Sequence, residues 1–142
     1  MKVKPFGQLT KREWKAIGGY STLRRARISP KKMKLIADLI KGMNAQEADY
    51  TLQFTPKKGA RLMRKVLRAA VASYRDKFAP ERSVDDLYPH LRIAIVKVDR
   101  GPMWKIPKPA VKPARFGGNG IFRRRTSHIT VVVLPDSKKE GK

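Results

Sequence analysis

Apolar residues recur at helical spacing in three segments of the chain between residues 29 and 78. The first segment opens with Ser29 as an N-cap and Pro30 as the first helical residue, and Gly42 is placed to end it. Asn44, with Glu47 three residues later, resembles a capping box and predicts a short second helix. The apolar stripe of the first helix consists of Met33, Leu35, Ile36, Ala37, Leu39 and Ile40.

The third segment carries the longest apolar stripe. Thr55-Pro56 repeats the pairing of a cap residue with proline and predicts the start of this helix. Its apolar residues follow the spacing of one helix face, and they are Met63, Val66, Leu67, Ala70, Val71 and Tyr74. Basic residues flank or oppose that stripe, namely Lys57, Arg61, Arg64, Lys65 and Arg68. We therefore predict that one face of the helix is packed and another is cationic.

Alternating apolar residues predict the strands. A period of two begins at Leu91 and changes phase near Ile95, which indicates a strand with a β-bulge at that position. The β-branched segment 126–134 predicts a second strong strand, and a looser alternation over 23–28 predicts a short one. The segment 78–89 contains prolines and acids and is predicted to be a loop.

The segment between the two strong strands is rich in proline and glycine and lacks the aliphatic residues of a core. If the flanking strands pair, this segment forms an extended hairpin arm over about residues 99–127, which could reach on the order of 40 Å. We therefore predict an α+β fold with three helices packed on a small antiparallel sheet and a long extended β-hairpin arm. Residues 1–22 are interpreted as a basic N-terminal extension, 23–134 as a single RNA-binding domain, and 135–142 as a flexible tail.

The net charge of the chain indicates its functional class. The chain has 142 residues, with 34 Lys and Arg against 11 Asp and Glu, for a net charge of +23. Such a chain needs a polyanionic partner, and residues 101–128 contain seven basic residues and no acidic one. Cations neutralise phosphates, and aromatic rings stack on unpaired bases at about 1–3 kcal/mol each. These arm residues are Trp104, Lys105, Lys108, Lys112, Arg115, Phe116, Phe122, Arg123, Arg124 and Arg125.

Other classes find no support in the sequence. The lack of cysteine excludes disulfides and thiolate metal sites, and His90 and His128 do not have metal-ligand spacing. Asp85 and Asp86 are adjacent and point apart in an extended loop, so neither they nor Ser127 beside His128 form a catalytic group. Phosphate-binding glycine motifs, a membrane span and a signal-peptide core are also missing. We expect no enzyme activity, cofactor, small-molecule substrate or membrane partner, and a cytosolic location or its organellar counterpart.

Several segments resemble the ribosomal protein L22 family of the large subunit, of bacterial type. The resemblance covers about residues 23–134, and its segments are 27–42, 52–58, 85–87, 98–102 and, most specifically, 125–133. Arg100 stands where the family commonly has an acid, and residues 114–120 replace its denser basic tract. The family is known for a small body on the subunit surface and a β-hairpin that threads through ribosomal RNA to the nascent-peptide exit tunnel.

The resemblance implies a structural component of the large subunit that stabilises folded rRNA and contacts neighbouring ribosomal proteins and the nascent polypeptide. Charge pattern and resemblance together predict these rRNA-binding residues: Arg24, Arg25, Arg27, Lys31, Lys32, Lys57, Lys58, Arg61, Lys105, Lys108, Lys112, Arg115, Arg123, Arg124, Arg125 and His128. The resemblance assigns the tunnel-facing tip to Trp104, Ile106, Lys108, Lys112, Arg115 and Phe116. Two alternatives stay open, a nucleic-acid chaperone that binds DNA and RNA alike and an RNA-modifying enzyme with convergent titratable groups.

Overall fold

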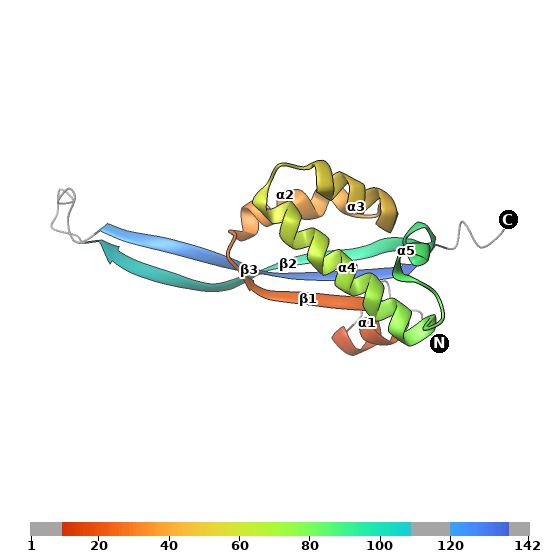
Figure 1. The fold of residues 1–142 in the computed structure, drawn as a ribbon. Coiled ribbons are helices and arrows are strands. Elements are labelled where there is room, and N and C mark those ends of the chain that lie inside the picture. Colours follow the sequence, from red (N-terminus) through yellow and green to blue (C-terminus); the bar gives the residue numbers. More distant parts are fainter. Residues whose placement is uncertain (1–9, 109–119, 137–142) are drawn as a thin grey trace.

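A computed structural model of the chain describes residues 10–108 and 120–136 (Figure 1). Its elements are α1 (Lys11–Ile17), β1 (Gly19–Ala26), α2 (Pro30–Ile40), α3 (Ala45–Phe54), α4 (Lys58–Phe78), α5 (Val84–Leu87), the 3-10 helix η2 (Tyr88–His90), β2 (Leu91–Lys108) and β3 (Gly120–Pro135). The strands form one antiparallel sheet in the order β1-β3-β2. Helices α2, α3 and α4 lie on one side of this sheet, which confirms the predicted α+β fold.

The core lies between α2, α4 and the covered face of the sheet. Ile129, Val131 and Val133 alternate along β3 and are fully buried, because this face of the central strand meets the helices. The predicted stripe of α4 is buried from Met63 to Val71. A Cβ atom at Gly19 would lie 2.3 Å from the Ala70 carbonyl oxygen, so the close approach of α4 to β1 requires glycine there.

The apolar stripe of α2 is narrower than predicted. Met33 and Ile40 are fully buried, whereas Leu35 is 66% and Leu39 is 43% exposed. A helix that packs on one side only buries the residues of one face, and Leu35 and Leu39 lie at its margin. The ends of α2 are as predicted, with Ser29 at the N-cap and Pro30 as its first residue. After α2, Gly42 has φ +79°, in the left-handed region that glycine adopts without strain.

The predicted caps of the next two helices differ in detail. Asn44 caps α3, but its side chain accepts a hydrogen bond from the backbone N–H of Gln46 (2.9 Å) rather than completing a capping box with Glu47. Thr55 does not cap α4, which begins at Lys58. Its hydroxyl donates to the Thr51 carbonyl (2.7 Å) at the end of α3 instead. The Thr-Pro pair therefore belongs to the connection between the two helices.

Two segments contain more regular structure than the sequence predicts. Strand β1 begins at Gly19 and ends at Ala26, so the predicted 23–28 strand starts too late and the boundary drawn at residue 22 falls inside β1. The predicted loop at 78–89 contains α5 and η2, and Ser83 caps α5 by accepting from the Asp86 backbone N–H (3.2 Å). The division into extension, domain and tail stays a prediction.

The arm is formed by the far halves of β2 and β3. The predicted bulge near Ile95 is confirmed, because Ile93 pairs with Val133 while Ile95 pairs with the next residue, Val132. A second register shift lies between Arg100 and Met103, where the arm leaves the body. Beyond that shift β2 and β3 pair with each other as far as Lys108 and Gly120, without β1.

The arm projects from one end of the body, and α5 lies at the other end (Figure 1). At ~3.4 Å per residue, the β3 part of the arm, residues 120–126, extends about 24 Å. The predicted hairpin is thus confirmed over its paired part. Residues 109–119, which contain the predicted tip positions Lys112, Arg115 and Phe116, lie outside the described residues.

Candidate nucleic-acid interface

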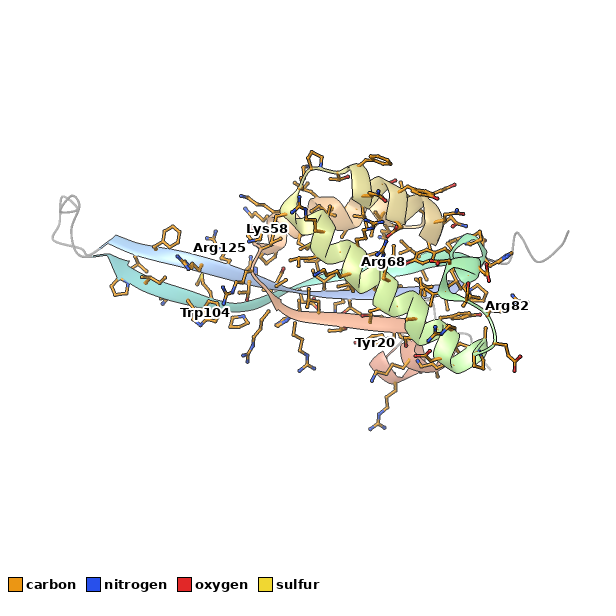
Figure 2. All side chains as sticks on the ribbon, viewed as in Figure 1. Tyr20, Lys58, Arg68, Arg82, Trp104 and Arg125 are labelled. Atoms are coloured by element: carbon orange, nitrogen blue, oxygen red, sulfur yellow. The ribbon has the colours of Figure 1, made fainter. Side chains whose placement is uncertain are left out.

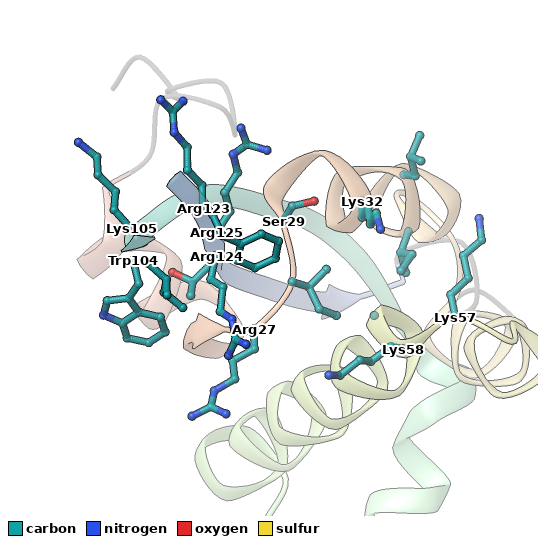
Figure 3. A pocket seen from close by; sticks show the side chains of 17 residues that line it. Arg27, Ser29, Lys32, Lys57, Lys58, Trp104, Lys105, Arg123, Arg124 and Arg125 are labelled. Carbon is teal, nitrogen blue, oxygen red and sulfur yellow. The ribbon is translucent and has the colours of Figure 1, made fainter. Parts of the chain in front are cut away.

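A cleft of about 1380 Å³ lies at the root of the arm, beside the N-terminal ends of α2 and α4 (Figure 3). We call it the basic cleft, because it is lined by cations and by no carboxylate. Its basic residues are Arg27, Lys32, Lys57, Lys58, Lys105, Arg123, Arg124 and Arg125. All eight are among the predicted rRNA-binding residues, and the fold brings them together from four separate segments of the sequence.

The two helices that border the cleft present their N-terminal ends to it. Lys32 lies in the first turn of α2, and Lys57 and Lys58 are the N-cap and the first residue of α4. Cations at these ends oppose the helix dipole, a small cost that a bound anion would offset. A Cβ atom at Gly59 would lie 2.4 Å from the Ile36 side chain, so α2 and α4 meet closely where these lysines are held.

The arm has two faces of different character. Lys105 pairs with Arg123 and Met103 with Arg125, so these residues share one face of the ribbon. The opposite face carries the next pairs along, Trp104 with Arg124 and Ile106 with Phe122. Figure 3 shows Arg123 and Arg125 extending together to one side and Trp104 with Arg124 to the other.

The side chains of the arm are available to a partner. Trp104 and Phe122 are each 49% exposed, and the Arg124 guanidinium lies 5.9 Å from the centroid of the Phe122 ring. Within residues 10–108 and 120–136, no carboxylate forms an ion pair with a cation of the basic cleft. In the described part of the chain, their charges therefore face solvent rather than a carboxylate.

The cationic face predicted for α4 is divided. Its Lys57 end lies in the basic cleft, but Arg64 donates two hydrogen bonds to Asp49 (2.8 Å each), and Arg68 lies 3.5 Å from the same carboxylate. Partial burial raises the pKa of Asp49, but hydrogen bonds from Arg64 and Arg68 outweigh it and hold that pKa below its usual value. The pKa of Arg64 is raised by its hydrogen bond to Asp49. The part of the helix face that carries Arg64 and Arg68 therefore has its ionic partner, Asp49, within the protein.

Comparison with known proteins decides the family. A family model described as ribosomal protein L22p/L17e matches residues 21–134, which include the sheet, α2 to α5 and both strands of the arm. The chain belongs to this family. The L22 family consists of structural ribosomal proteins, which confirms that the chain is not an enzyme.

Bacterial relatives agree over most of the chain. The large ribosomal subunit protein uL22 of Maridesulfovibrio salexigens is 48% identical over 107 residues, covering 75% of this chain and 88% of that protein. The protein of the same name from Pelotomaculum thermopropionicum is 39% identical over 129 residues, covering 91% of this chain and 99% of its own length. The L22 family match begins inside β1, so α1 lies outside it.

Other predicted contact residues lie outside the basic cleft. Arg24, Lys31 and Arg61 are exposed on β1, α2 and α4, but they do not line it. His128 is half-buried, and its Nδ1 accepts a hydrogen bond from the Arg25 backbone N–H (3.1 Å). Arg25 itself is exposed and has φ +57° at the irregularity of β1, a left-handed conformation that this hydrogen bond helps to hold.

Two residues that the family resemblance assigned to the tunnel-facing tip lie in the described part of the arm. Trp104 and Ile106 are in the paired ribbon and line the basic cleft, and Ile106 lies two residues before Lys108, whose pair with Gly120 is the last one described. Figure 2 shows Trp104 and Arg125 on the arm and Lys58 at the start of α4. The assignment of Trp104 and Ile106 to the tunnel-facing tip stays a prediction.

Six residues that line the cleft were not predicted as site residues, namely Ile28, Ser29, Leu35, Ile36, Gly59 and Thr126. Leu35 lines the cleft instead of joining the core, and its off-phase position in the α2 stripe was the available signal. Gly59, a glycine just inside α4, marks the close helix contact. Ile28 has no such signal, because it follows a strand whose end was misplaced. Across the described ranges, no cluster of His, Cys, Asp or Glu could hold a metal ion, and no helix is long and apolar enough to span a membrane.

Proposed function

We propose that this chain is a structural component of the large ribosomal subunit that binds large-subunit rRNA through the basic cleft and the arm, and stabilises the folded assembly. The observation that carries the proposal is the basic cleft, where cations from four segments converge without one carboxylate. The names of the relatives, large ribosomal subunit protein uL22, support the assignment to that subunit. Its partners are then rRNA and neighbouring ribosomal proteins.

The chemistry is architectural. Each Lys or Arg that meets a phosphate releases condensed counterions, which makes binding favourable and dependent on salt. A-form RNA is contacted mostly through its backbone and shape, so the protein would hold segments in place and read little sequence. Because body and arm both border the cleft, RNA bound there would be fixed relative to both.

The proposal includes the tip of the arm as part of the wall of the nascent-peptide exit tunnel. Its support is the resemblance of the segments at 98–102 and 125–133, together with an arm that projects beyond the body. A photo-crosslinking residue in place of Lys112 should label a stalled nascent chain in purified ribosomes. The same probe at Arg82, at the far end of the body, should not. Equal labelling from both positions would contradict the tunnel assignment.

The rRNA assignment is tested by sedimentation of a tagged full-length chain at about 0.5 M salt, where weak phosphate contacts are largely lost. The natural chain should comigrate with large subunits. Reversing the charge of Lys105, Arg123 and Arg125 to Glu should release it to the top of the gradient. The matched control reverses three exposed cations outside the cleft, Lys41, Lys65 and Arg82, and should comigrate.

The control separates site from net charge, because both triple variants change the total charge equally. Release of the natural chain at this salt would indicate a loosely bound chaperone or assembly factor instead. Equal release of both variants would show that total charge alone, and not the cleft, carries the interaction.

A further inference from the structure

The two faces of the arm bring different side chains to the basic cleft. Lys105, Arg123 and Arg125 lie on one face of the ribbon, and Trp104, Ile106, Phe122 and Arg124 lie on the other. Side chains on opposite faces point away from each other, so the cations beside the rings are Arg124 and Arg27, which extend to the same side as Trp104 (Figure 3). Trp104 and Phe122 are each about half exposed, although large exposed aromatic rings on a narrow ribbon are a liability in water.

A double helix would use the cations of the cleft but not its aromatic rings. In A-form RNA the phosphates face outward, and the bases are stacked inside behind a narrow major groove that side chains cannot enter. The cations could contact such a helix, but Trp104 and Phe122 would meet sugars and phosphates rather than base faces. Two half-exposed rings beside Arg124 and Arg27 match single-stranded sites, where phosphates follow the cations and bases stack on aromatic side chains.

The size and stacking surface of the cleft agree with such a ligand. Its volume of about 1380 Å³ exceeds the roughly 300–1,000 Å³ of pockets for drug-sized ligands, so more than one nucleotide can enter. Arg124 lies over the Phe122 ring at 5.9 Å, and a guanidinium plane is itself a surface on which bases stack. Ile106 pairs with Phe122 across the ribbon and extends the apolar surface of this face.

We propose that the basic cleft takes unpaired nucleotides of rRNA, with at least one base stacked on Trp104 or Phe122 and the adjoining phosphates on Arg124 and Arg27. The inference rests on the proposed function, since it names the RNA conformation that the same surface receives. An acidic polypeptide would satisfy the cations but would leave both rings without a stacking partner, so it is the less complete match.

The test compares two RNAs on the full-length chain at about 0.1 M salt. One is an unstructured single-stranded hexanucleotide, and the other is a 12-base-pair RNA duplex. Both carry a fluorescent label, and binding is followed by anisotropy. Trp104→Leu should weaken binding of the single strand roughly 5- to 150-fold, the range expected for one lost stacking contact. Binding of the duplex should change less than about twofold, because leucine leaves every cation in place.

The matched control is Phe54→Leu, which removes an aromatic ring that is 79% exposed but does not line the cleft. It should change the affinity for neither RNA. A second readout uses Trp14→Phe, which leaves Trp104 as the only tryptophan of the chain. The Trp14 ring nitrogen has no hydrogen-bond partner among residues 10–108 and 120–136, so phenylalanine loses no such bond there. Single-stranded RNA should then quench Trp104 fluorescence, and the duplex should not.

The outcomes separate this inference from the proposed function. If both RNAs bind but Trp104→Leu weakens them equally or not at all, without quenching, the cleft contacts backbone only and the inference is overturned while rRNA binding stands. If neither RNA binds, the proposed function fails first. If a hexaglutamate peptide displaces the single strand and quenches Trp104 as strongly at the same concentration, an acidic polypeptide is the better ligand and the inference is also overturned.

Discussion

Strand β3 passes through two environments. In the body, Ile129, Val131 and Val133 are fully buried beneath the helices. In the arm, Ile121 is 53% and Phe122 is 49% exposed on the same continuous strand. Apolar residues therefore have opposite roles on the two sides of the point where β1 ends. In the body they supply the stability of the fold, and in the arm they are available to a partner.

The difference lies in what each strand pair can bury. The body has a third strand and a layer of helices, so its sheet buries one face completely. The arm is a two-stranded ribbon, which is marginally stable at best in water. Its order would then depend on binding, and part of the contact energy with RNA would be spent on that ordering. Stability and function are thus largely carried by different parts of the chain.

The largest expected difference is in the free energy of unfolding, between variants of a buried and an exposed leucine. Leu67→Ala removes a fully buried side chain of α4 and should lower the free energy of unfolding by roughly 2–5 kcal/mol. Leu35→Ala removes a side chain that is 66% exposed at the cleft and should change it by less than about 0.5 kcal/mol. Urea unfolding followed by circular dichroism measures both. Similar losses would mean that Leu35 belongs to the core and that the body and the cleft are not energetically distinct.

Removing the far part of the arm should leave the stability of the body almost unchanged and weaken RNA binding. Replacing residues 106–122 with an Asn-Gly turn joins Lys105 to Arg123, which already face each other across the ribbon. The free energy of unfolding should change by less than about 1 kcal/mol, because none of the core residues of the described chain lies within 106–122. Affinity for rRNA fragments should fall on the order of a hundredfold, because cations and a stacking ring are lost.

The control for this replacement is the unfolding curve itself, measured on the same preparation used for RNA binding. An unfolded product would show that the arm stabilises the body and would break the comparison. A folded product with unchanged RNA affinity would place binding on the cleft residues that remain, and the arm beyond Lys105 would need another role.

Helices α2, α3 and α4 and the two long strands could be predicted, because their apolar spacing is set by a core on one side. The ends of β1 could not be predicted, because its residues 20–22 are polar or amphipathic and its partner strand, β3, is distant in sequence. The exposure of Leu35 and Leu39 also could not be predicted, because it depends on tertiary structure. The apolar spacing of a helix gives the width of its apolar stripe but not how much of that stripe other elements cover.

Many residues of the candidate site could be predicted from the sequence, but their convergence on one cleft could not. Composition identified the cations of the arm and of the helix starts, but only the fold showed that Lys32, Lys58 and Arg123 line one cleft. The pairing of Arg64 with Asp49 could not be predicted, because the two lie on different helices. The sequence therefore made Arg64 look as free as Lys57.

The paired cations of the body provide a smaller test. Asp49→Asn removes the charge that Arg64 and Arg68 share and should lower the free energy of unfolding by about 1–3 kcal/mol at pH 7. The pKa of Asp49 is lower in the folded chain than in the unfolded one, so its stabilisation is present above the unfolded value near 4 and is lost as pH falls through the folded value.

The difference between the natural chain and Asp49→Asn should therefore be constant from pH 7 to about 5 and shrink below about pH 4. Arg125→Gln is the control, since no carboxylate among the described residues pairs with Arg125. Its unfolding free energy should follow that of the natural chain across the same range. A pH-dependent loss in the control instead would mean that the cations of the cleft are paired in the free protein.

The smallest expected effect on stability concerns the junction between the body and the arm. Ser127 pairs with Ala26 at the end of β1, and its fully buried hydroxyl has no hydrogen-bond partner in the described part of the chain. The neighbouring Thr126 hydroxyl donates to the Pro102 carbonyl (2.6 Å). Ser127→Ala should raise the free energy of unfolding by about 1 kcal/mol, because an unsatisfied buried hydroxyl is removed. Thr126→Val should lower it by about as much, because a made hydrogen bond is lost. Thermal unfolding of the two variants should thus shift in opposite directions. A shift downward in both would show that Ser127 has a partner, such as a bound water, and that the junction between body and arm is fully satisfied.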